Sequence, residues 1–195
     1  MSATGQAIKR AMDVVLAGGA LALGWPFLAA LGILIRIDSP GPAIFRQERA
    51  GRGMRPFVLV KFRTMRAGVE AFGASPAGPA DARLTRLGRW LRETTIDELP
   101  QLWNVLKGDM SVVGPRPLYL SQAEEFTAEQ RRRLEVRPGL TGLAQVSGRG
   151  EIPHEEKLRM DVRYVEQWSL WLDVKIILGS VILLLPGGKV YQKWT

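Results

Sequence analysis

Two adjacent carboxylates, Asp97 and Glu98, lie within the segment TTIDELPQLWNVLKGDMSVVGPRP, residues 94–117. Such a pair can bind magnesium, and a carboxylate can also attack a phosphoryl group to form an acyl phosphate. Two neighbouring like charges raise the pKa of one of them unless a cation intervenes. The pair therefore indicates phosphoryl chemistry, a metal site, or both.

The same residues also have a purely structural interpretation. Asp97 could cap a helix, which would put Pro100 at the third helical position, where no intrahelical donor is lost. The two interpretations are compatible, because the N-terminus of a helix carries a positive dipole end that favours phosphate. Spacing alone does not choose between capping and catalysis.

Cations and glycines follow the carboxylates. Arg116 lies between two prolines that keep it out of a regular element, so its guanidinium could be presented for bidentate contact with phosphate. A tight turn with a solvated arginine is the alternative. The segment RPGLTGLAQVSGRG, residues 137–150, is rich in glycine, which permits close approach to a ligand but is also ordinary in loops.

Short helices and a β-hairpin are predicted to position these groups. Residues 42–51 and 55–66 alternate apolar and basic side chains, which predicts a hairpin with Lys61 and Arg63 at its end, beside the site. A helix is expected over residues 83–95, where leucines recur at helical spacing. Residues 67–82, rich in Gly, Ala and Pro, predict a loop that could act as a lid.

An uncharged apolar run, VVLAGGALALGWPFLAALGILI, covers residues 14–35. At about 1.5 Å per residue it matches a bilayer core of roughly 30 Å. Basic residues close both ends, so the positive-inside rule gives no orientation for a straight crossing. The pair Trp25-Pro26 interrupts the run, and proline kinks a helix. We expect a broken helix over about residues 8–36 that enters and leaves the same leaflet, with a kinked spanning helix as the alternative.

The overall composition limits the partners and the metal. Lys and Arg outnumber Asp and Glu by 27 to 19, a net charge of +8 that favours anionic partners such as lipid headgroups, phosphorylated substrates or nucleic acid. The absence of cysteine excludes thiolate zinc sites, and a single histidine fits a zinc enzyme poorly. An oxygen-ligated metal such as Mg²⁺ is therefore expected.

Five segments together resemble the bacterial sugar transferase family, the monotopic phosphoglycosyl transferases, over nearly the whole chain from Lys9 onward. They are KRAMDVVLA, KFRTM, LTRLGRWLR, DELPQLWNVLKGDMSVVGPRP and RPGLTGLAQVSGR. The expected fold is α+β and mainly helical, a single domain over residues 1–195. It comprises a re-entrant membrane hairpin, then a compact catalytic part over residues 37–195 with amphipathic interfacial helices and a small β-hairpin, on the cytoplasmic face of the bacterial inner membrane.

The resemblance implies transfer of a sugar 1-phosphate from a UDP-sugar to a polyprenyl phosphate such as undecaprenyl phosphate, with Mg²⁺. Asp97 would be the nucleophile that expels UMP, and Glu98 would bind the metal with it. Phosphate-binding residues would be Arg92, Arg116, Lys61 and Arg63. Contacts to the donor are expected from Arg137, Thr141, Gln145 and Arg149.

This chain departs from the family pattern in three places. Many relatives carry Ser-Pro at the helix break instead of Trp25-Pro26, and Trp and Asn where this chain has Leu143 and Ser147. Larger relatives add membrane spans before this domain, so the minimal form is expected. Glucose, galactose and N-acetylated amino sugars all fit, as do capsule, exopolysaccharide, O-antigen and glycoprotein pathways. A homodimer is compatible with the sequence.

Two rival functions use the same features. A membrane-tethered protein that binds anionic lipid or nucleic acid without catalysis would explain the charge and the anchor. The carboxylate pair argues against it, so nucleic acid is not an expected partner. A hydrolase of nucleotide sugars is the other rival, and it would not need a lipid phosphate acceptor.

Overall fold

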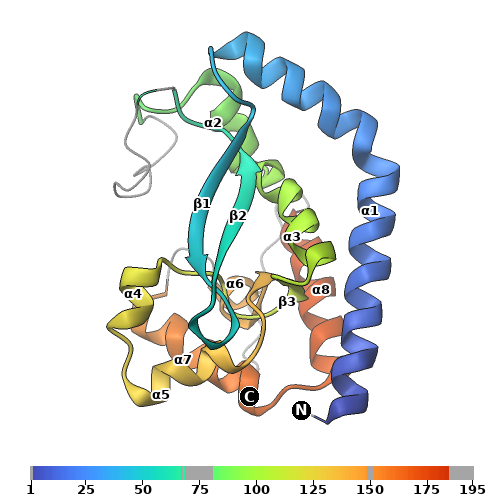
Figure 1. Cartoon of the computed structure of the whole chain (residues 1–195), viewed down its shortest axis with the longest axis vertical. Helices are drawn as coiled ribbons and strands as arrows, with labels where there is room; N and C mark the ends of the chain where they lie inside the picture. Colours follow the sequence, from blue (N-terminus) through green and yellow to red (C-terminus); the bar gives the residue numbers. More distant parts are fainter. Residues whose placement is uncertain (1, 67, 69–80, 149–151, 185–195) are drawn as a thin grey trace.

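The computed structural model describes residues 2–66, 68, 81–148 and 152–184. A long helix, α1 (Ala3–Asp38), runs beside a body of short helices and a β-hairpin and bends over the end of that body (Figure 1). The body also contains a second two-stranded sheet. The prediction of a mainly helical α+β fold is confirmed.

The predicted hairpin is confirmed as β1 (Ile44–Ala50) and β2 (Pro56–Phe62), joined through the 3₁₀ helix η1 (Arg52–Met54). The strands are antiparallel, and Phe45 lies opposite Lys61. Asn104 forms hydrogen bonds with the backbone at the free edge of β2. Its side-chain oxygen accepts from the Val60 N–H at 3.1 Å, and its side-chain nitrogen donates to the Val58 carbonyl at 2.7 Å. The edge strand is thus fixed to the helix that carries Asn104.

The remaining elements are short, apart from two helices near the end of the described chain. The helices are α2 (Arg86–Glu93), η2 (Ile96–Gln101), α3 (Leu102–Lys107), α4 (Leu120–Glu124), α5 (Ala128–Arg131), η3 (Arg132–Glu135), α6 (Leu143–Gly148), α7 (His154–Glu166) and α8 (Leu170–Leu184). The strands β3 (Ser111–Val113) and β4 (Gly139–Thr141) pair in parallel. The sequence did not predict this pair, because three residues give no detectable alternation.

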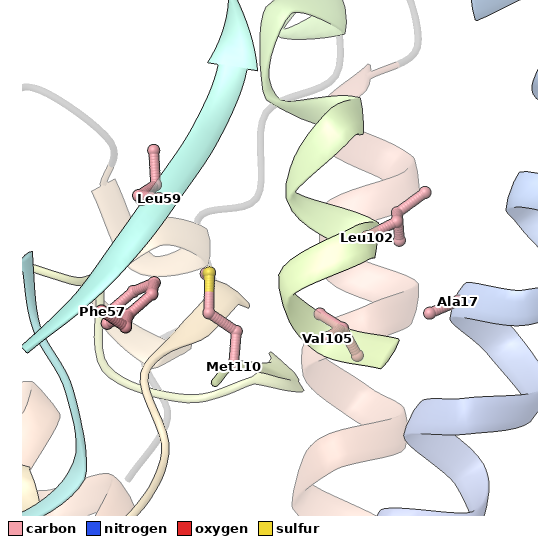
Figure 2. Close-up of a cluster of buried hydrophobic side chains, with 6 residues drawn as sticks. All are labelled: Ala17, Phe57, Leu59, Leu102, Val105 and Met110. Atoms are coloured by element: carbon pink, nitrogen blue, oxygen red, sulfur yellow. The ribbon is translucent and has the colours of Figure 1, made fainter. Parts of the chain in front are cut away.

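A cluster of buried apolar side chains joins the hairpin, α3 and α1. It is built from Ala17, Phe57, Leu59, Leu102, Val105 and Met110 (Figure 2). The small side chain of Ala17 lets the backbone of α1 approach α3 closely, and α1 and α3 are in extensive contact. The long helix is therefore part of the tertiary core as well as an apolar segment.

Helix α1 is continuous through Pro26, so the prediction of two helices separated by a break is wrong. Proline removes one N–H from the helical ladder, and its ring crowds the carbonyl of the preceding turn, which bends a helix without necessarily ending it. Helix α1 is bent in Figure 1. The adjacent Trp25 is 65% exposed. At 36 residues the helix is about 54 Å long, and its length and composition suffice to cross a membrane.

Both ends of α1 are attached to the same body. Near its start, Asp13 accepts hydrogen bonds from the hydroxyl of Ser111 and the N–H of Val112 in β3. Near its end, Leu31 and Ile35 pack in a second core cluster that includes residues of β2 and α2. The middle of the helix is apolar and open, with large side chains exposed there. Both ends of α1 therefore contact the same folded body.

Gly88 in α2 allows the closest helix-to-backbone contact of this region. A Cβ at this position would overlap the Thr64 carbonyl. Gly88→Ala is expected to cost about 1–3 kcal/mol of unfolding free energy, because the neighbour is backbone and cannot rotate away. Thermal unfolding of the detergent-solubilised protein measures the loss.

Gly19→Ala in α1 is the matched control, because a Cβ there meets nothing within 4 Å. Alanine has a higher helix propensity than glycine, so this variant should melt no lower than the wild type. Equal losses in the two variants would show that the close contact at Gly88 does not govern stability.

Candidate active site

The carboxylate pair lies on the 3₁₀ helix η2, directly after a strained residue. Thr95 is left-handed with φ of 59°, an uncommon conformation for a β-branched side chain, and it occupies the N-cap position without a side-chain capping bond. Asp97 is inside the helix, so the alternative interpretation in which it caps the helix does not hold. The turn at Thr95 fixes the direction in which Asp97 and Glu98 leave the backbone.

Asp97 is buried and its charge is disfavoured. Asp97 is only 5% exposed to solvent. Burial first, and then the charge of Glu98, raise the pKa of Asp97 to about 6, against the opposing effect of Lys61, Arg92 and Arg116. Asp97 is therefore poised to change charge close to neutral pH.

Glu98 behaves in the opposite way because it has a direct partner. Arg116 Nη2 donates to Glu98 Oε1 at 2.5 Å. Burial alone would raise the pKa of Glu98, but the charge and hydrogen bond of Arg116, together with the charges of Lys61 and Arg92, outweigh it and lower the pKa below its usual value. The environments of the two carboxylates thus push their pKa values apart, the pattern by which one fold assigns different tasks to two acids.

A cavity of about 610 Å³ opens beside this pair. Arg92, Glu98 and Arg116 lie in its wall, together with apolar residues of β4, α6 and α8. Asp97 is buried and is not among the described residues that line the cavity, although its neighbour Glu98 is. Catalytic contacts commonly tighten only when substrate binds.

The structure brings together most of the predicted site residues. Lys61 lies close enough for its charge to act on Asp97, and burial lowers its own pKa. Thr141 and Gln145 line the cavity, as do Arg92 and Arg116.

Two further predicted contacts, Arg63 and Arg137, are not part of this group. The guanidinium of Arg63 is buried and donates to the carbonyl oxygens of Pro40, Ile35 and Ser39, which caps the end of α1. Arg137 is absent from the described cavity wall, and burial, then the nearby cations Arg10 and Arg52, lower its pKa. The contacts of these two arginines give no support to a role in phosphate or donor binding. Arg149 lies outside the described residues.

One buried ion pair in the cavity wall was not predicted from the sequence. The sequence RRR at residues 131–133 is usually a solvated face, yet Arg133 is only 2% exposed and pairs with Asp161 of α7 at 2.6 Å. Arg133 also donates to the Arg116 carbonyl at 2.6 Å, so it fixes the backbone of the residue that holds Glu98. In the sequence, His154, Leu158 and Asp161 recur at helical spacing, which places them on one face of a helix. All three line the cavity, so this spacing was the sequence feature that could have indicated this part of the wall.

The departures at residues 143 and 147 fall outside the wall of this cavity. Leu143 is buried in a core cluster with Val113 and Tyr164, and the Ser147 hydroxyl donates to the Leu143 carbonyl within α6. Neither belongs to the described lining.

The donor set fits magnesium held jointly with substrate. Among the described residues no three His, Cys, Asp or Glu side chains gather as a ready cation site. Mg²⁺ is typically bound by one or two carboxylates together with substrate phosphates, and Asp97 and Glu98 supply that number. A cation shared by the pair would also relieve the repulsion that raises the pKa of Asp97.

Comparison with known proteins assigns the chain to a family. Residues 4–187 match the bacterial sugar transferases. The chain belongs to this family. It is 46% identical over 191 residues to the UDP-glucose:undecaprenyl-phosphate glucose-1-phosphate transferase of Caulobacter vibrioides, covering 94% of this chain and 72% of that protein. This sugar transferase is accordingly a phosphoglycosyl transferase.

Two other relatives differ in length and in name. The exopolysaccharide production protein PSS of Rhizobium leguminosarum bv. phaseoli is 41% identical over 194 residues, covering 93% of this chain and 97% of its own length. The UDP-N-acetylgalactosamine-undecaprenyl-phosphate N-acetylgalactosaminephosphotransferase of Aeromonas hydrophila is 42% identical over 186 residues, which is 92% of this chain but 44% of that protein. The sugar transferase thus spans less than half of the Aeromonas protein, and the Caulobacter and Aeromonas relatives are named for different sugars.

Proposed function

We propose that this sugar transferase moves a sugar 1-phosphate from a UDP-sugar to undecaprenyl phosphate through a covalent bond to Asp97, releasing UMP. The observation that carries the proposal is the divided carboxylate pair beside the cavity, with Asp97 at a pKa of about 6 and Glu98 ionised against Arg116. A nucleophile must be ionised at working pH yet weakly solvated, and a buried carboxyl with this pKa meets both conditions.

In the first half-reaction a carboxylate oxygen of Asp97 attacks the β-phosphorus of the donor. The bond from that phosphorus to the bridging oxygen of UMP breaks, and UMP departs with the electron pair. The sugar phosphate is left on Asp97 as a mixed anhydride. Arg92 and Arg116 border the cavity and stabilise the negative charge that spreads over the phosphoryl oxygens.

In the second half-reaction a phosphate oxygen of undecaprenyl phosphate attacks the same phosphorus. The bond to Asp97 breaks, the carboxylate is regenerated, and the product is a polyprenyl diphosphate sugar. Mg²⁺, held by Glu98 and Asp97, would supply neutralisation of the diphosphate charge. Lys61 adds a further positive charge at Asp97.

We also propose that α1 enters the membrane re-entrantly, with the catalytic part on the cytoplasmic face of the bacterial inner membrane. The attachment of both helix ends to one body supports this path, because a straight crossing would carry one end away from it. Anionic headgroups suit the net charge of +8. A homodimer stays a prediction, and we expect no nucleic-acid partner.

Release of UMP from UDP-glucose, UDP-galactose and their N-acetylated analogues tests the function, with Mg²⁺ and with or without undecaprenyl phosphate. We expect continuous release from one sugar nucleotide only when the lipid is present. Equal turnover without lipid would identify a hydrolase. Binding of the lipid or donor without UMP release from any sugar would favour the non-catalytic alternative.

The decrease in kcat/KM at low pH, the acidic limb of the pH–rate profile, should report the ionisation of Asp97. Because Asp97 must be ionised to attack, kcat/KM for the donor is expected to fall as pH drops through about 6. Glu98→Gln removes the charge that raises this pKa and frees Arg116 to lower it further, so the limb should move to lower pH. The maximal rate should fall by roughly a hundredfold at the same time, because the metal loses a ligand.

Glu93→Gln is the matched control for this profile, since Glu93 is an exposed acid in the same cavity wall. In Glu93→Gln, kcat/KM should fall at the same pH as in the wild type. An unmoved or raised limb in Glu98→Gln would contradict the assignment of the limb to Asp97.

A further inference from the structure

The residues that line the cavity include two chemically different groups, which come from different elements. One group, Arg92, Glu98 and Arg116, can hold a phosphate. The other includes Ile177, Val181 and Leu183 of α8. The Thr141 and Ser180 hydroxyls hydrogen-bond at 2.5 Å, which fixes α8 against β4. A ligand that contacts both groups must be anionic at one point and apolar at another.

Helix α8 separates the cavity from an apolar outer surface. Val181 lines the cavity and is also 52% exposed, so it lies at the rim. Leu178 and Ile182 are similarly exposed, at 56% and 48%, but do not belong to the described lining. Trp171 on the same helix is 64% exposed, and tryptophan favours the headgroup layer of a membrane. An apolar surface thus continues from the outside of α8 over Val181 into the cavity.

We propose that the α8 side of the cavity holds the first isoprene units of the polyprenyl acceptor, which enters laterally over Val181. This inference rests on the proposed function. A polyprenyl phosphate combines the two chemistries of the wall, because its phosphate needs the cations and its chain needs apolar contact. The UDP-sugar is polar along its length and gains little from three aliphatic side chains.

Charge and continuity both favour the lipid over a soluble occupant. The chain emerging past Val181 would meet the exposed side chain of Leu178, one helical turn away, and then the bilayer. At the inner end, Arg116 stands at the cavity wall with a half-exposed side chain that can contact a second phosphate. The acceptor phosphate would then approach Asp97 from the α8 side.

Val181→Trp tests the proposal, because the larger side chain narrows the rim of the cavity. Ile182→Trp is the matched control, because it adds the same side chain to the same helix at a residue outside the cavity lining. Two measurements separate the half-reactions. Exchange of labelled UMP into the UDP-sugar without lipid reports the donor side alone, and turnover against undecaprenyl phosphate concentration reports the acceptor side. Val181→Phe is a milder second variant, and the lipid-free exchange itself shows that each variant is folded.

Val181→Trp is expected to keep lipid-free exchange within about twofold of wild type while its KM for undecaprenyl phosphate rises about tenfold or more. Ile182→Trp should change neither. A parallel loss of exchange in Val181→Trp would show that donor occupies this side and would overturn the proposal. Equal KM values in the two tryptophan variants would overturn it as well. Absence of both activities from the wild type would instead refute the proposed function.

Discussion

Replacement of Asp97 by asparagine is expected to reduce sugar-phosphate transfer by roughly a thousandfold or more, because an amide cannot form the acyl phosphate. The loss should appear in lipid-free UMP exchange as well as in complete turnover, since both begin with attack by Asp97. Donor binding should survive, because the cations that hold phosphate remain. Equilibrium binding of the UDP-sugar and single-turnover UMP release measure the two effects separately.

The same substitution is expected to stabilise the fold at neutral pH. The folded pKa of Asp97, about 6, lies above its ordinary value of 3.8, so folding disfavours the charged form. The resulting loss of unfolding free energy is complete above pH 6 and disappears as pH falls below about 4. A pKa difference of roughly two units corresponds to about 3 kcal/mol of unfolding free energy. In EDTA at pH 8, Asp97→Asn should therefore melt several degrees higher than wild type. At pH 4 the difference should vanish.

Glu93→Gln serves as the control here too, because it removes an acid from the same wall without touching the pair. It should retain activity and show no such gain in stability. Substantial turnover by Asp97→Asn would refute the nucleophile assignment. If Glu98→Gln alone lost the exchange reaction, the nucleophile would be Glu98 instead.

Lys9→Met is expected to destabilise the protein by about 3–5 kcal/mol, because it leaves a buried charge without its partner. Lys9 Nζ donates to Asp173 Oδ2 at 2.7 Å, and Asp173 is fully buried in α8. Tyr164 and Trp168 also donate to Asp173, at 2.7 Å and 3.1 Å, but both are neutral groups. Burial, followed by the effect of Asp173, raises the pKa of Tyr164, so it stays a neutral donor. Chemical or thermal unfolding in detergent measures the loss.

Lys107→Met is the matched control, since Lys107 pairs with Asp109 at 2.9 Å but its side chain is 50% exposed. Exposed ion pairs contribute about 0–1 kcal/mol, so this variant should be close to wild type. A Lys9→Met protein as stable as Lys107→Met would show that the buried pair does not secure the start of α1.

Long, regular patterns were predictable from the sequence. The alternation in two seven-residue strands revealed the hairpin, and the apolar run revealed α1. Both signals are local, because they depend on repeating spacing within one segment. Motif resemblance then identified the carboxylate pair and its arginines, which the structure gathers around one cavity apart from the covered Asp97.

Features that depend on distant partners were not predictable. Arg133 and Asp161 form an ion pair across 28 positions. The spacing of Asp161 with His154 and Leu158 indicates a shared helix face, but it does not identify Arg133 as the partner of Asp161. The short η2 helix depends on a left-handed Thr95, a conformation that sequence propensity assigns to other residue types. Arg63 resembled a phosphate ligand because it is a cation in a family motif, whereas its donors are used by carbonyls at the end of α1.

If α1 enters the bilayer re-entrantly, as proposed above, its attachment at both ends limits how the sugar transferase can adapt to the membrane. A free spanning helix answers a change in bilayer thickness by tilting. Helix α1 is joined to β3 near its start and to β2 and α2 near its end, so tilting would break core contacts. The exposed middle of the helix can therefore descend only to a depth that the folded body permits. Lipids around it must thin or thicken to match the protein, and the elastic cost of embedding falls on the membrane.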